Sequence, residues 1–239
     1  MTRLRAVLFD MGNVLLDMGN ASGLPSGKLD FRGREAIAQA VRRGGGKVSP
    51  EELERLVFAP WRAEYERRYE TGREASWEPH MRRLRRAART RLRDLTLLGH
   101  WFAPYAESLR PISGARDAVR ALAGRGLRLA IVSNVPLPGK LYEAELRRHR
   151  LLRRFAHREW SYDAGSRKPS PAMLRRALAA LDAEPAEAVM VGDRRRSDIA
   201  AGRAAGVRTV WLRTADGGGP APDLEIDTLA ELPGVLGIK

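Results

Sequence analysis

The sequence predicts an α/β fold: a doubly wound parallel sheet with an all-helical domain inserted after its first strand. Three observations predict it. A short apolar run near the N-terminus, Ala6–Phe9, is typical of a buried strand. Residues 31 to about 105 are helical in periodicity throughout. From residue 110 on, apolar runs alternate with helical patterns, as in a parallel sheet joined by crossover helices.

Asp10 is the first charged residue after this apolar run. A strand that ends there delivers a carboxylate to the edge at which open α/β sheets bind ligands. Gly12 allows a sharp turn that leaves its carbonyl facing the same way as Asp10. An aspartate so placed can coordinate a divalent cation or attack phosphorus, although an aspartate that caps a strand-to-loop corner has the same local sequence. Residues 13–17 are expected to form an extended or turn-like flap.

The helical region is expected to be a separate domain. Residues 19–28 are rich in Gly, Ser and Pro and are typical of a linker. We therefore expect a core of residues 1–18 and 108–239 and a helical domain of residues 19–107. Within the helical domain, Ser49, Pro50 and Glu52 predict a helix start with a capping box.

Two side-chain patterns in the helical domain have alternative interpretations. An aromatic stripe at helical spacing can be a wall that faces substrate or a buried seam: Phe58, Trp61, Tyr65 and Tyr69. Residues 81–94 carry seven arginines around an apolar line that continues to Leu95. This pattern predicts an amphipathic helix whose arginines either bind anions or are a solvated face.

After residue 110 the expected elements follow the order of a doubly wound sheet. Strands are expected over residues 127–132, 160–162, 188–191 and 207–212. Helices are expected from 115 to about 124, through 141–146, from Ser170-Pro171 to 181, and from Ser197 to Gly206. A last strand and helix are expected within residues 224–236.

Composition limits the class of protein. The chain has 239 residues, of which 44% are hydrophobic and 30% charged, as in a globular protein of one or two domains. It has no cysteine and four scattered histidines, so neither disulfides nor a zinc site is expected. No stretch resembles a signal peptide or a membrane span, so we expect a cytoplasmic protein with no membrane partner.

The formal net charge of +14 favours anionic substrates. A basic chain can also bind nucleic acid. Here, however, the arginines are spread over every segment and do not gather with aromatic residues on one face. Nucleic acid is therefore not the expected partner, and no motif indicates an oligomeric state.

Further polar residues are expected at the edge of the sheet where Asp10 lies, because they end later strands or precede helices there: Ser133, Asn134, Lys168, Asp193 and Asp198. Parallel strands present their carboxyl ends at one edge, so these residues should converge. A phosphoryl group transferred to Asp10 needs its charge neutralised as the transition state forms. A hydroxyl, an ammonium and a cation held by Asp10 and Asp193 would supply that, and the cation would let two carboxylates lie close together.

In this set the chain resembles the haloacid dehalogenase-like (HAD) hydrolase superfamily, most of whose members hydrolyse phosphate esters with magnesium. Four segments in order carry the resemblance: Phe9–Val14, Ile131–Asn134, Arg167–Pro171, and Val191–Asp193 with Asp198–Ala200. The match covers about residues 4–17 and 110–212. The helical domain stands where this family places its cap domain, so the resemblance implies a Rossmann-like core with a cap.

The resemblance also implies a role for each matched residue. Asp10 would be the nucleophile and a ligand of Mg²⁺, with the Gly12 carbonyl and Asp193 as further ligands. Ser133 and Asn134 would hold the phosphoryl oxygens. Lys168 would neutralise charge and orient Asp10, and Asp198 would support Lys168 or a metal-bound water. The implied function is magnesium-dependent hydrolysis of small phosphorylated metabolites through an aspartyl-phosphate intermediate on Asp10.

The chain departs from the family pattern at Gly12, where phosphatases of this family usually have a second aspartate that acts as general acid and base. General acid–base catalysis contributes about 10²–10⁴ in rate. Three alternatives follow: Asp17, a metal-bound water or the substrate itself moves the proton; the substrate has a good leaving group; or the protein is a catalytically weak or inactive phosphate-binding regulator. Arg194–Arg196 either extend the anion site or are solvated loop residues.

Overall fold

The computed structural model describes residues 3–19, 24–69, 73–214 and 218–238, without the side chain of Tyr69. A six-stranded sheet with strand order β5-β4-β1-β6-β7-β8 forms its centre, and every neighbouring pair is parallel. The strands are β1 (Ala6–Phe9), β4 (Arg128–Ser133), β5 (His157–Trp160), β6 (Ala188–Gly192), β7 (Arg208–Leu212) and β8 (Leu224–Ile226). The predicted doubly wound α/β fold is therefore confirmed.

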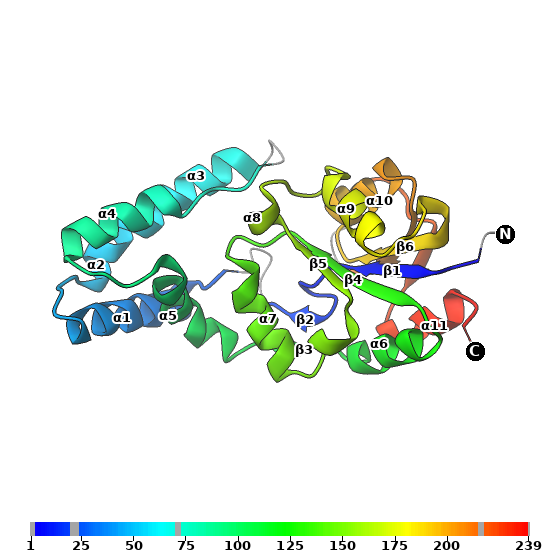
Figure 1. Cartoon of the computed structure of the whole chain (residues 1–239), viewed down its shortest axis with the longest axis horizontal. Helices are drawn as coiled ribbons and strands as arrows, with labels where there is room; N and C mark the ends of the chain where they lie inside the picture. Colours follow the sequence, from blue (N-terminus) through cyan, green and yellow to red (C-terminus); the bar gives the residue numbers. More distant parts are fainter. Residues whose placement is uncertain (1–2, 20–23, 70–72, 215–217, 239) are drawn as a thin grey trace.

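Helices cover both faces of this sheet (Figure 1). One face carries α6 (Ala115–Gly124), α7 (Gly139–Arg148) and α11 (Leu232–Val235), and the other carries α9 (Ala172–Ala180) and α10 (Ala200–Ala204). Alternating residues of β1 supply the two cores: Val7 and Phe9 pack on the α6 and α7 side, and Ala6 and Leu8 on the α9 side. Short helical turns connect these elements: α8 (Ser161–Ala164), Leu152–Arg154, Pro185–Glu187, Arg195–Ile199 and Leu229–Glu231.

The register of the central strands aligns the ends that carry polar residues. Phe9, the last residue of β1, is paired with Ile131 of β4 and Val191 of β6. The backbone N–H of Asp10 continues the ladder by donating to the Val191 carbonyl at 2.9 Å. The segments that follow β1, β4 and β6 therefore leave the sheet at the same edge.

A two-stranded antiparallel ribbon lies at the point where the chain leaves the sheet for the helical part. It pairs β2 (Leu16–Asp17) with β3 (Arg110–Pro111). Residues 13–17, expected to be extended or turn-like, thus include a strand whose partner lies more than 90 residues further along the chain. The ribbon holds the outgoing and returning segments side by side.

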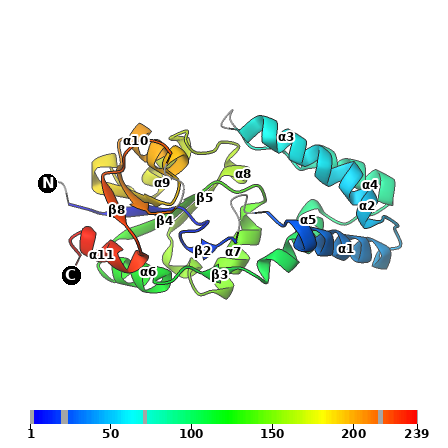
Figure 2. The same ribbon diagram turned by 180° about the vertical axis from the view of Figure 1, so that it is seen from behind.

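The helical part between these two strands forms the elongated lobe that Figures 1 and 2 show beside the sheet. Its elements are α1 (Gly27–Arg43), α2 (Pro50–Leu53), a wide helical turn (Glu54–Phe58), α3 (Ala59–Tyr69), α4 (Glu78–Ala88) and α5 (Asp94–Ala106). The predicted capping box at Ser49 is confirmed, since Ser49 and Glu52 each accept a backbone N–H bond from the other. Residues 20–23 of the expected linker lie outside the described residues. The boundaries 1–18, 19–107 and 108–239 stay a prediction.

The aromatic stripe divides between a buried core and a cavity. Phe58 and Trp61 are fully buried and contact Trp77, and Phe58 also contacts Trp101. Tyr65, one turn further along α3, lines the cavity described below. The buried-seam interpretation is thus confirmed for Phe58 and Trp61, a role of Tyr65 in facing substrate stays a prediction, and the Tyr69 side chain lies outside the described part.

Two predicted elements are wrong in part. The arginine-rich helix ends at Ala88, because Arg89 adopts a left-handed conformation and the Thr90 hydroxyl accepts the Leu92 N–H, a bond that competes with helix continuation. The strand expected at 160–162 ends at Trp160. There the Ser161 hydroxyl accepts the Val135 N–H, and the chain turns into α8.

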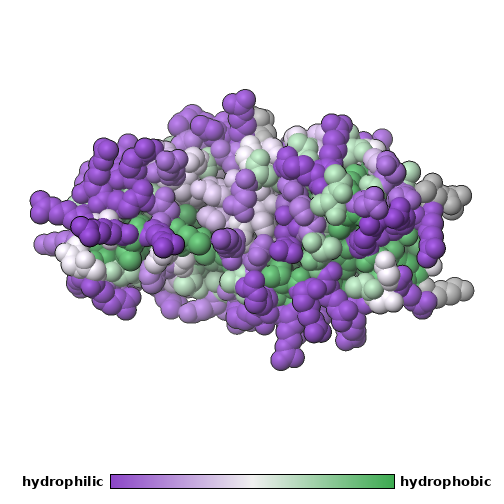
Figure 3. Space-filling view, viewed as in Figure 1, coloured by the Kyte–Doolittle hydropathy of each residue, from purple (hydrophilic) through white to green (hydrophobic). Residues whose placement is uncertain are grey.

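Hydrophilic side chains extend over both the helical lobe and the sheet on the face shown in Figure 3. Among the described residues, no helix combines the length and apolar character needed to cross a lipid bilayer.

The helical lobe depends on the close approach of α1 and α5. A Cβ at Gly33 would lie 2.3 Å from the Trp101 carbonyl oxygen, so the two helices cannot keep this distance with any larger residue there. Overpacking of this kind costs about 1–3 kcal/mol. We expect Gly33→Ala to lower the free energy of unfolding by about that amount in thermal and urea unfolding.

Gly124→Ala is the matched control. A Cβ at Gly124 meets no atom within 4 Å, so the same change should be neutral or stabilise α6 by up to about 1 kcal/mol. Equal unfolding midpoints for the two variants would contradict the proposed packing constraint.

Candidate active site

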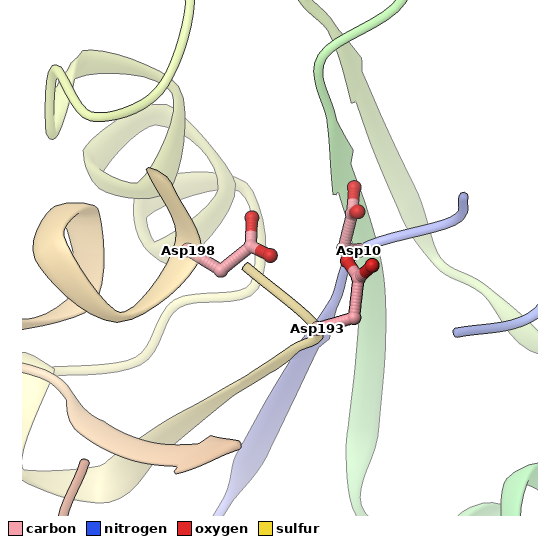
Figure 4. Close-up of side chains that lie close together, drawn as sticks. All are labelled: Asp10, Asp193 and Asp198. Carbon is pink, nitrogen blue, oxygen red and sulfur yellow. The ribbon is translucent and has the colours of Figure 1, made fainter. Parts of the chain in front are cut away.

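Three aspartates from different segments converge at the carboxyl edge of the sheet (Figure 4). Asp10 follows β1, Asp193 follows β6, and Asp198 lies in the turn Arg195–Ile199. One carboxylate oxygen of each lies within 4.8 Å of the others, and all three residues are buried. Gly192 permits this arrangement, because a Cβ there would lie 2.2 Å from the Asp198 Cβ.

Lys168 is the cation at the centre of this cluster. Its Nζ lies 2.9 Å from Asp10 Oδ1 and 2.7 Å from Asp198 Oδ1, and it donates to the Val132 carbonyl at 2.7 Å. The side chain of Lys168 is 1% exposed. Its three contacts account for all three ammonium protons, which fixes the ammonium between two carboxylates.

The electrostatic environment of Lys168 keeps it charged. Burial by itself lowers the pKa of Lys168, but the carboxylates of Asp10 and Asp198 outweigh burial, and the net pKa is raised. Burial raises the pKa of Asp198, and Lys168 opposes that shift. Both carboxylate oxygens of Asp198 contact protein groups, because its Oδ2 also accepts the Arg194 N–H at 2.9 Å.

Asp193 has the features of a ligand for a cation. Its backbone carbonyl accepts the Trp211 indole N–H at 2.8 Å, but its buried Oδ1 has no hydrogen-bond partner among the described residues. Burial, followed by the charges of Asp198 and Asp10, raises the pKa of Asp193 to about 8. With all three carboxyl groups ionised and one ammonium beside them, the cluster lacks two positive charges, which suits a hard divalent cation, so the residues present fit Mg²⁺.

The segment after β4 holds the backbone of Lys168 in place through hydrogen bonds. Asn134 Oδ1 accepts the Lys168 N–H at 2.8 Å, and Asn134 Nδ2 donates to the Lys168 carbonyl at 2.9 Å. The sequence did not indicate this pairing of a side-chain amide with a backbone. Ser133 is 1% exposed and ends β4, but it is not among the residues that line the cavity. Contacts of Ser133 and Asn134 with phosphoryl oxygens stay a prediction.

The loop after Asp10 is tight. Asn13, with φ of 54°, takes the left-handed conformation, and its backbone N–H donates to the Leu16 carbonyl at 2.7 Å. The sharp turn expected at Gly12 therefore uses Asn13 for its unusual backbone angle, which asparagine tolerates. Gly12 lies between Asp10 and this turn and lines the cavity.

A cavity with an empty volume of about 540 Å³, its mouth included, opens above these residues. It is lined by Asp10, Met11, Gly12, Asn13, Met18, Tyr65, Asn134, Val135, Pro136, Tyr142, Arg167, Lys168, Arg194, Ser197 and Asp198. Sequence reasoning missed Tyr142 and assigned no role to Arg167, although Arg167 immediately precedes Lys168.

The positions of Asp17 and of the arginine run 194–196 bear on the alternatives that the sequence leaves open for these residues. Asp17 is exposed, and its Oδ1 accepts the Gly19 N–H at 2.8 Å, so it is a surface residue of the ribbon. Arg194 lines the cavity, whereas Arg195 donates to the Pro220 and Gly219 carbonyls and stacks on Trp211. The arginine run thus contributes one residue to the cavity.

The helical lobe contacts the sheet next to the cavity. Ser161 Oγ donates to Glu74 Oε1 at 2.6 Å, and Arg167 Nη1 lies 3.5 Å from the same oxygen. The Trp77 indole donates to the Pro136 carbonyl at 2.8 Å. These contacts place Tyr65 over the cavity, where its ring lies 5.3 Å from the Arg167 guanidinium.

Comparison with known proteins gives a family and several relatives. The family model described as haloacid dehalogenase-like hydrolase matches residues 4–206. The chain is 37% identical over 105 residues to the glyceraldehyde 3-phosphate phosphatase of Pyrococcus furiosus, covering 44% of this chain and 43% of that protein. It is 27% identical to the glyceraldehyde 3-phosphate phosphatase of Methanopyrus kandleri over 98% and 97% of the two chains. The first relatives are matched over less than half of their length.

A solved structure supports the same relationship. The crystal structure of a HAD phosphatase from Thermococcus onnurineus is 25% identical, with a TM-score of 0.64 over 98% of both chains. The similarity therefore extends over the helical lobe as well as the sheet.

Removal of the Lys168 charge should destabilise the protein in a pH-dependent way. Loss of one partner from a buried ion pair costs about 3–5 kcal/mol. In Lys168→Met, the pKa of Asp198 would rise further. The free energy of unfolding of this variant therefore falls as pH rises above the ordinary aspartate range, because the ionised form of Asp198 is destabilised in the folded protein. With a chelator present, we expect the thermal midpoint to fall more at pH 8 than at pH 5.

Lys140→Met is the matched control, because Lys140 is exposed in α7. It should change the midpoint little at either pH. An equal loss for Lys168→Met at both pH values would show that packing of the side chain, and not its charge, is what the cluster needs.

Proposed function

Because the chain belongs to the haloacid dehalogenase-like hydrolase family, we propose that it hydrolyses phosphate esters of small metabolites with Mg²⁺ through an aspartyl-phosphate on Asp10. The observation that carries this proposal is the position of Lys168 between Asp10 and Asp198, beside Asp193. The phosphatase names of the matched relatives support it. We keep the division into a core (1–18 and 108–239) and a cap (19–107) as part of the proposal.

In the first step, a carboxylate oxygen of Asp10 attacks phosphorus and the bond to the leaving oxygen breaks. Lys168 orients Asp10 through the 2.9 Å contact and opposes the negative charge of the phosphoryl oxygens. Asn134 fixes the backbone of Lys168 from the next segment. Asp198 holds the ammonium in place and does not need to touch the substrate.

Asp10 and Asp193, with the carbonyl of Gly12, are the residues that we propose to hold Mg²⁺. The unpartnered Oδ1 of Asp193 supports this assignment. When bound, the metal supplies positive charge that lets a phosphate dianion approach two carboxylates. In the second step, water attacks phosphorus, phosphate leaves, and the Asp10 carboxylate is restored.

The proton that the leaving oxygen needs has no aspartate donor at position 12. Asp17 is exposed at the surface ribbon, so it is poorly placed to supply that proton. We propose that the proton comes from water or the substrate. Slow turnover of alkyl phosphates and faster turnover of esters with good leaving groups would follow.

Asp10→Asn should abolish the hydrolysis of p-nitrophenyl phosphate, because an amide cannot form the phosphoryl intermediate. We expect a loss of at least about 10³-fold in kcat at constant Mg²⁺, of the size seen when a nucleophile is removed. The measurement is p-nitrophenol release at saturating substrate. Asp17→Asn, a matched exposed change, should keep the wild-type rate.

The alternative function makes the opposite prediction. A phosphate-binding regulator without turnover would release no p-nitrophenol at any Mg²⁺ concentration, while phosphate would still raise the thermal midpoint. That outcome would reject hydrolysis and leave the binding site intact.

Magnesium should stabilise the wild-type protein but not Asp193→Asn. At a concentration of 100 times its dissociation constant, a ligand adds about 2.7 kcal/mol. In chelator, we expect the wild type to be the less stable of the two proteins. The pKa of Asp193 in the folded protein, about 8, exceeds its unfolded value, so ionisation of Asp193 destabilises the wild type as pH rises. We therefore expect Asp193→Asn to melt higher than wild type in chelator at pH 7.5, and lower in Mg²⁺.

Asp182→Asn is the control for that measurement, because the Asp182 side chain is 89% exposed. It should respond to Mg²⁺ as wild type does. A full magnesium response in Asp193→Asn would remove Asp193 from the set of ligands.

A further inference from the structure

Glu74 of the helical lobe contacts the rest of the chain directly beside Lys168. It lies in the segment between α3 and α4, next to α8 (Figure 1), and its side chain is 4% exposed. Its Oε1 accepts the Ser161 hydroxyl at 2.6 Å and lies 3.5 Å from Arg167 Nη1. Arg167 immediately precedes Lys168. One carboxylate oxygen of the lobe thus contacts two segments that lie outside the lobe.

The contact between Glu74 and Arg167 is a buried ion pair, because the two residues are 8% and 3% exposed. Burial raises the pKa of Glu74, while the charge of Arg167 and then the Ser161 hydroxyl oppose that shift. A guanidinium keeps its charge when it is buried. Loss of the Glu74 charge would therefore remove a compensating charge from a buried cation next to Lys168.

A second connection leads from Glu74 to Lys168 through Ser161. The Ser161 hydroxyl, which donates to Glu74, also accepts the Val135 N–H at 2.8 Å. Val135 follows Asn134, whose side-chain amide makes both hydrogen bonds to the Lys168 backbone. The two connections end on the same residue, one along the chain and the other from the segment after β4.

The position of Lys168 leaves little room for displacement. Its Nζ makes contacts of 2.7 to 2.9 Å with Asp10, Asp198 and the Val132 carbonyl, and its side chain is 1% exposed. Misplacement of a catalytic group by about 1 Å can cost about 10²-fold in rate. A small shift of the backbone at residue 167 is therefore enough to affect the function that we propose for Lys168.

Trp77 anchors the segment that carries Glu74. Its indole donates to the Pro136 carbonyl at 2.8 Å, and its ring stacks on Trp61 with centroids 3.8 Å apart. Trp77 is fully buried. Because this anchor does not involve the carboxylate, a change at Glu74 should leave the lobe docked.

We propose that Glu74 is a positioning residue, which from the helical lobe fixes Lys168 through Arg167 and Ser161. The inference rests on the proposed hydrolysis and gives the lobe a part in its chemical step. Glu74 is not among the residues that line the cavity, so it acts without touching the substrate. Lys168 must be in place when charge develops on the phosphoryl oxygens, so loss of Glu74 should slow the reaction more than it weakens substrate binding.

Glu74→Gln keeps the size of the side chain and an acceptor for the Ser161 hydroxyl, and it removes the charge that faces Arg167. We expect kcat for p-nitrophenyl phosphate to fall about 10- to 100-fold with little change in KM. The measurement is the initial rate of p-nitrophenol release, well below the thermal midpoint of each variant. Glu78→Gln is the matched control, because the Glu78 side chain begins α4 and is 69% exposed. It should keep the wild-type kcat and KM.

Arg167→Gln tests whether the two charges act as one connection. It should also lower kcat, and the double variant should lose no more than the weaker single variant, because either change already breaks the connection. The double variant should melt higher than Glu74→Gln, since both partners of the buried pair are then removed together. A merely structural ion pair would move the thermal midpoint and leave kcat unchanged.

Three outcomes overturn the proposal: wild-type kcat in Glu74→Gln, a raised KM at unchanged kcat, or single losses that multiply in the double variant. If wild type hydrolyses no ester, p-nitrophenyl phosphate included, the proposed function fails separately. The connection is then measured as the Kd of inorganic phosphate in Mg²⁺, from thermal shift. Glu74→Gln must weaken that affinity, and Arg167→Gln must add nothing to the loss. An affinity that Glu74→Gln leaves unchanged, or no phosphate binding by wild type, would overturn the positioning role as well.

Discussion

The buried ammonium of Lys168 is the interaction on which the site depends. It joins Asp10, which follows the first strand, to Asp198, which lies nearly two hundred residues later, and it donates to the strand between them. An uncompensated carboxylate cluster at this depth is strongly unfavourable. The ammonium therefore allows one oxygen of each of the three carboxyl groups to lie within 4.8 Å of the others, and it leaves the ionised cluster short of two positive charges.

The fold and the acidic part of the site could be predicted from the sequence because both follow from periodicity. Four apolar residues before Asp10 and four before Gly192-Asp193 indicate buried strands, and parallel pairing brings their ends to one edge. The capping box at Ser49 is similarly local, since its two bonds join residues three apart. Where a short-range rule determines position, the sequence is sufficient.

The residues by which helices line the cavity could not be predicted, because they depend on where the helices pack. Tyr142 lies on a helix whose periodicity does not indicate which residues face a cavity, and Tyr65 belongs to a stripe whose earlier members are core. The Asn134 amide pairs with the backbone of a residue 34 positions away, a contact without any sequence signal. The break at Arg89 was missed because one left-handed residue and one threonine hydroxyl decide it.

The ribbon of β2 and β3 brings together the two points at which the helical lobe joins the rest of the chain. Asp17 and Arg110 are direct partners in it, and such partners in antiparallel strands have Cα atoms about 5 Å apart. The segment between them thus leaves the sheet and returns to it at the same place. A turn of a few residues could connect β2 to β3 in place of the helical lobe without changing the strand order of the sheet. Exchange of one helical lobe for another therefore needs only two junctions, which lie side by side, and leaves the register of the central strands unchanged.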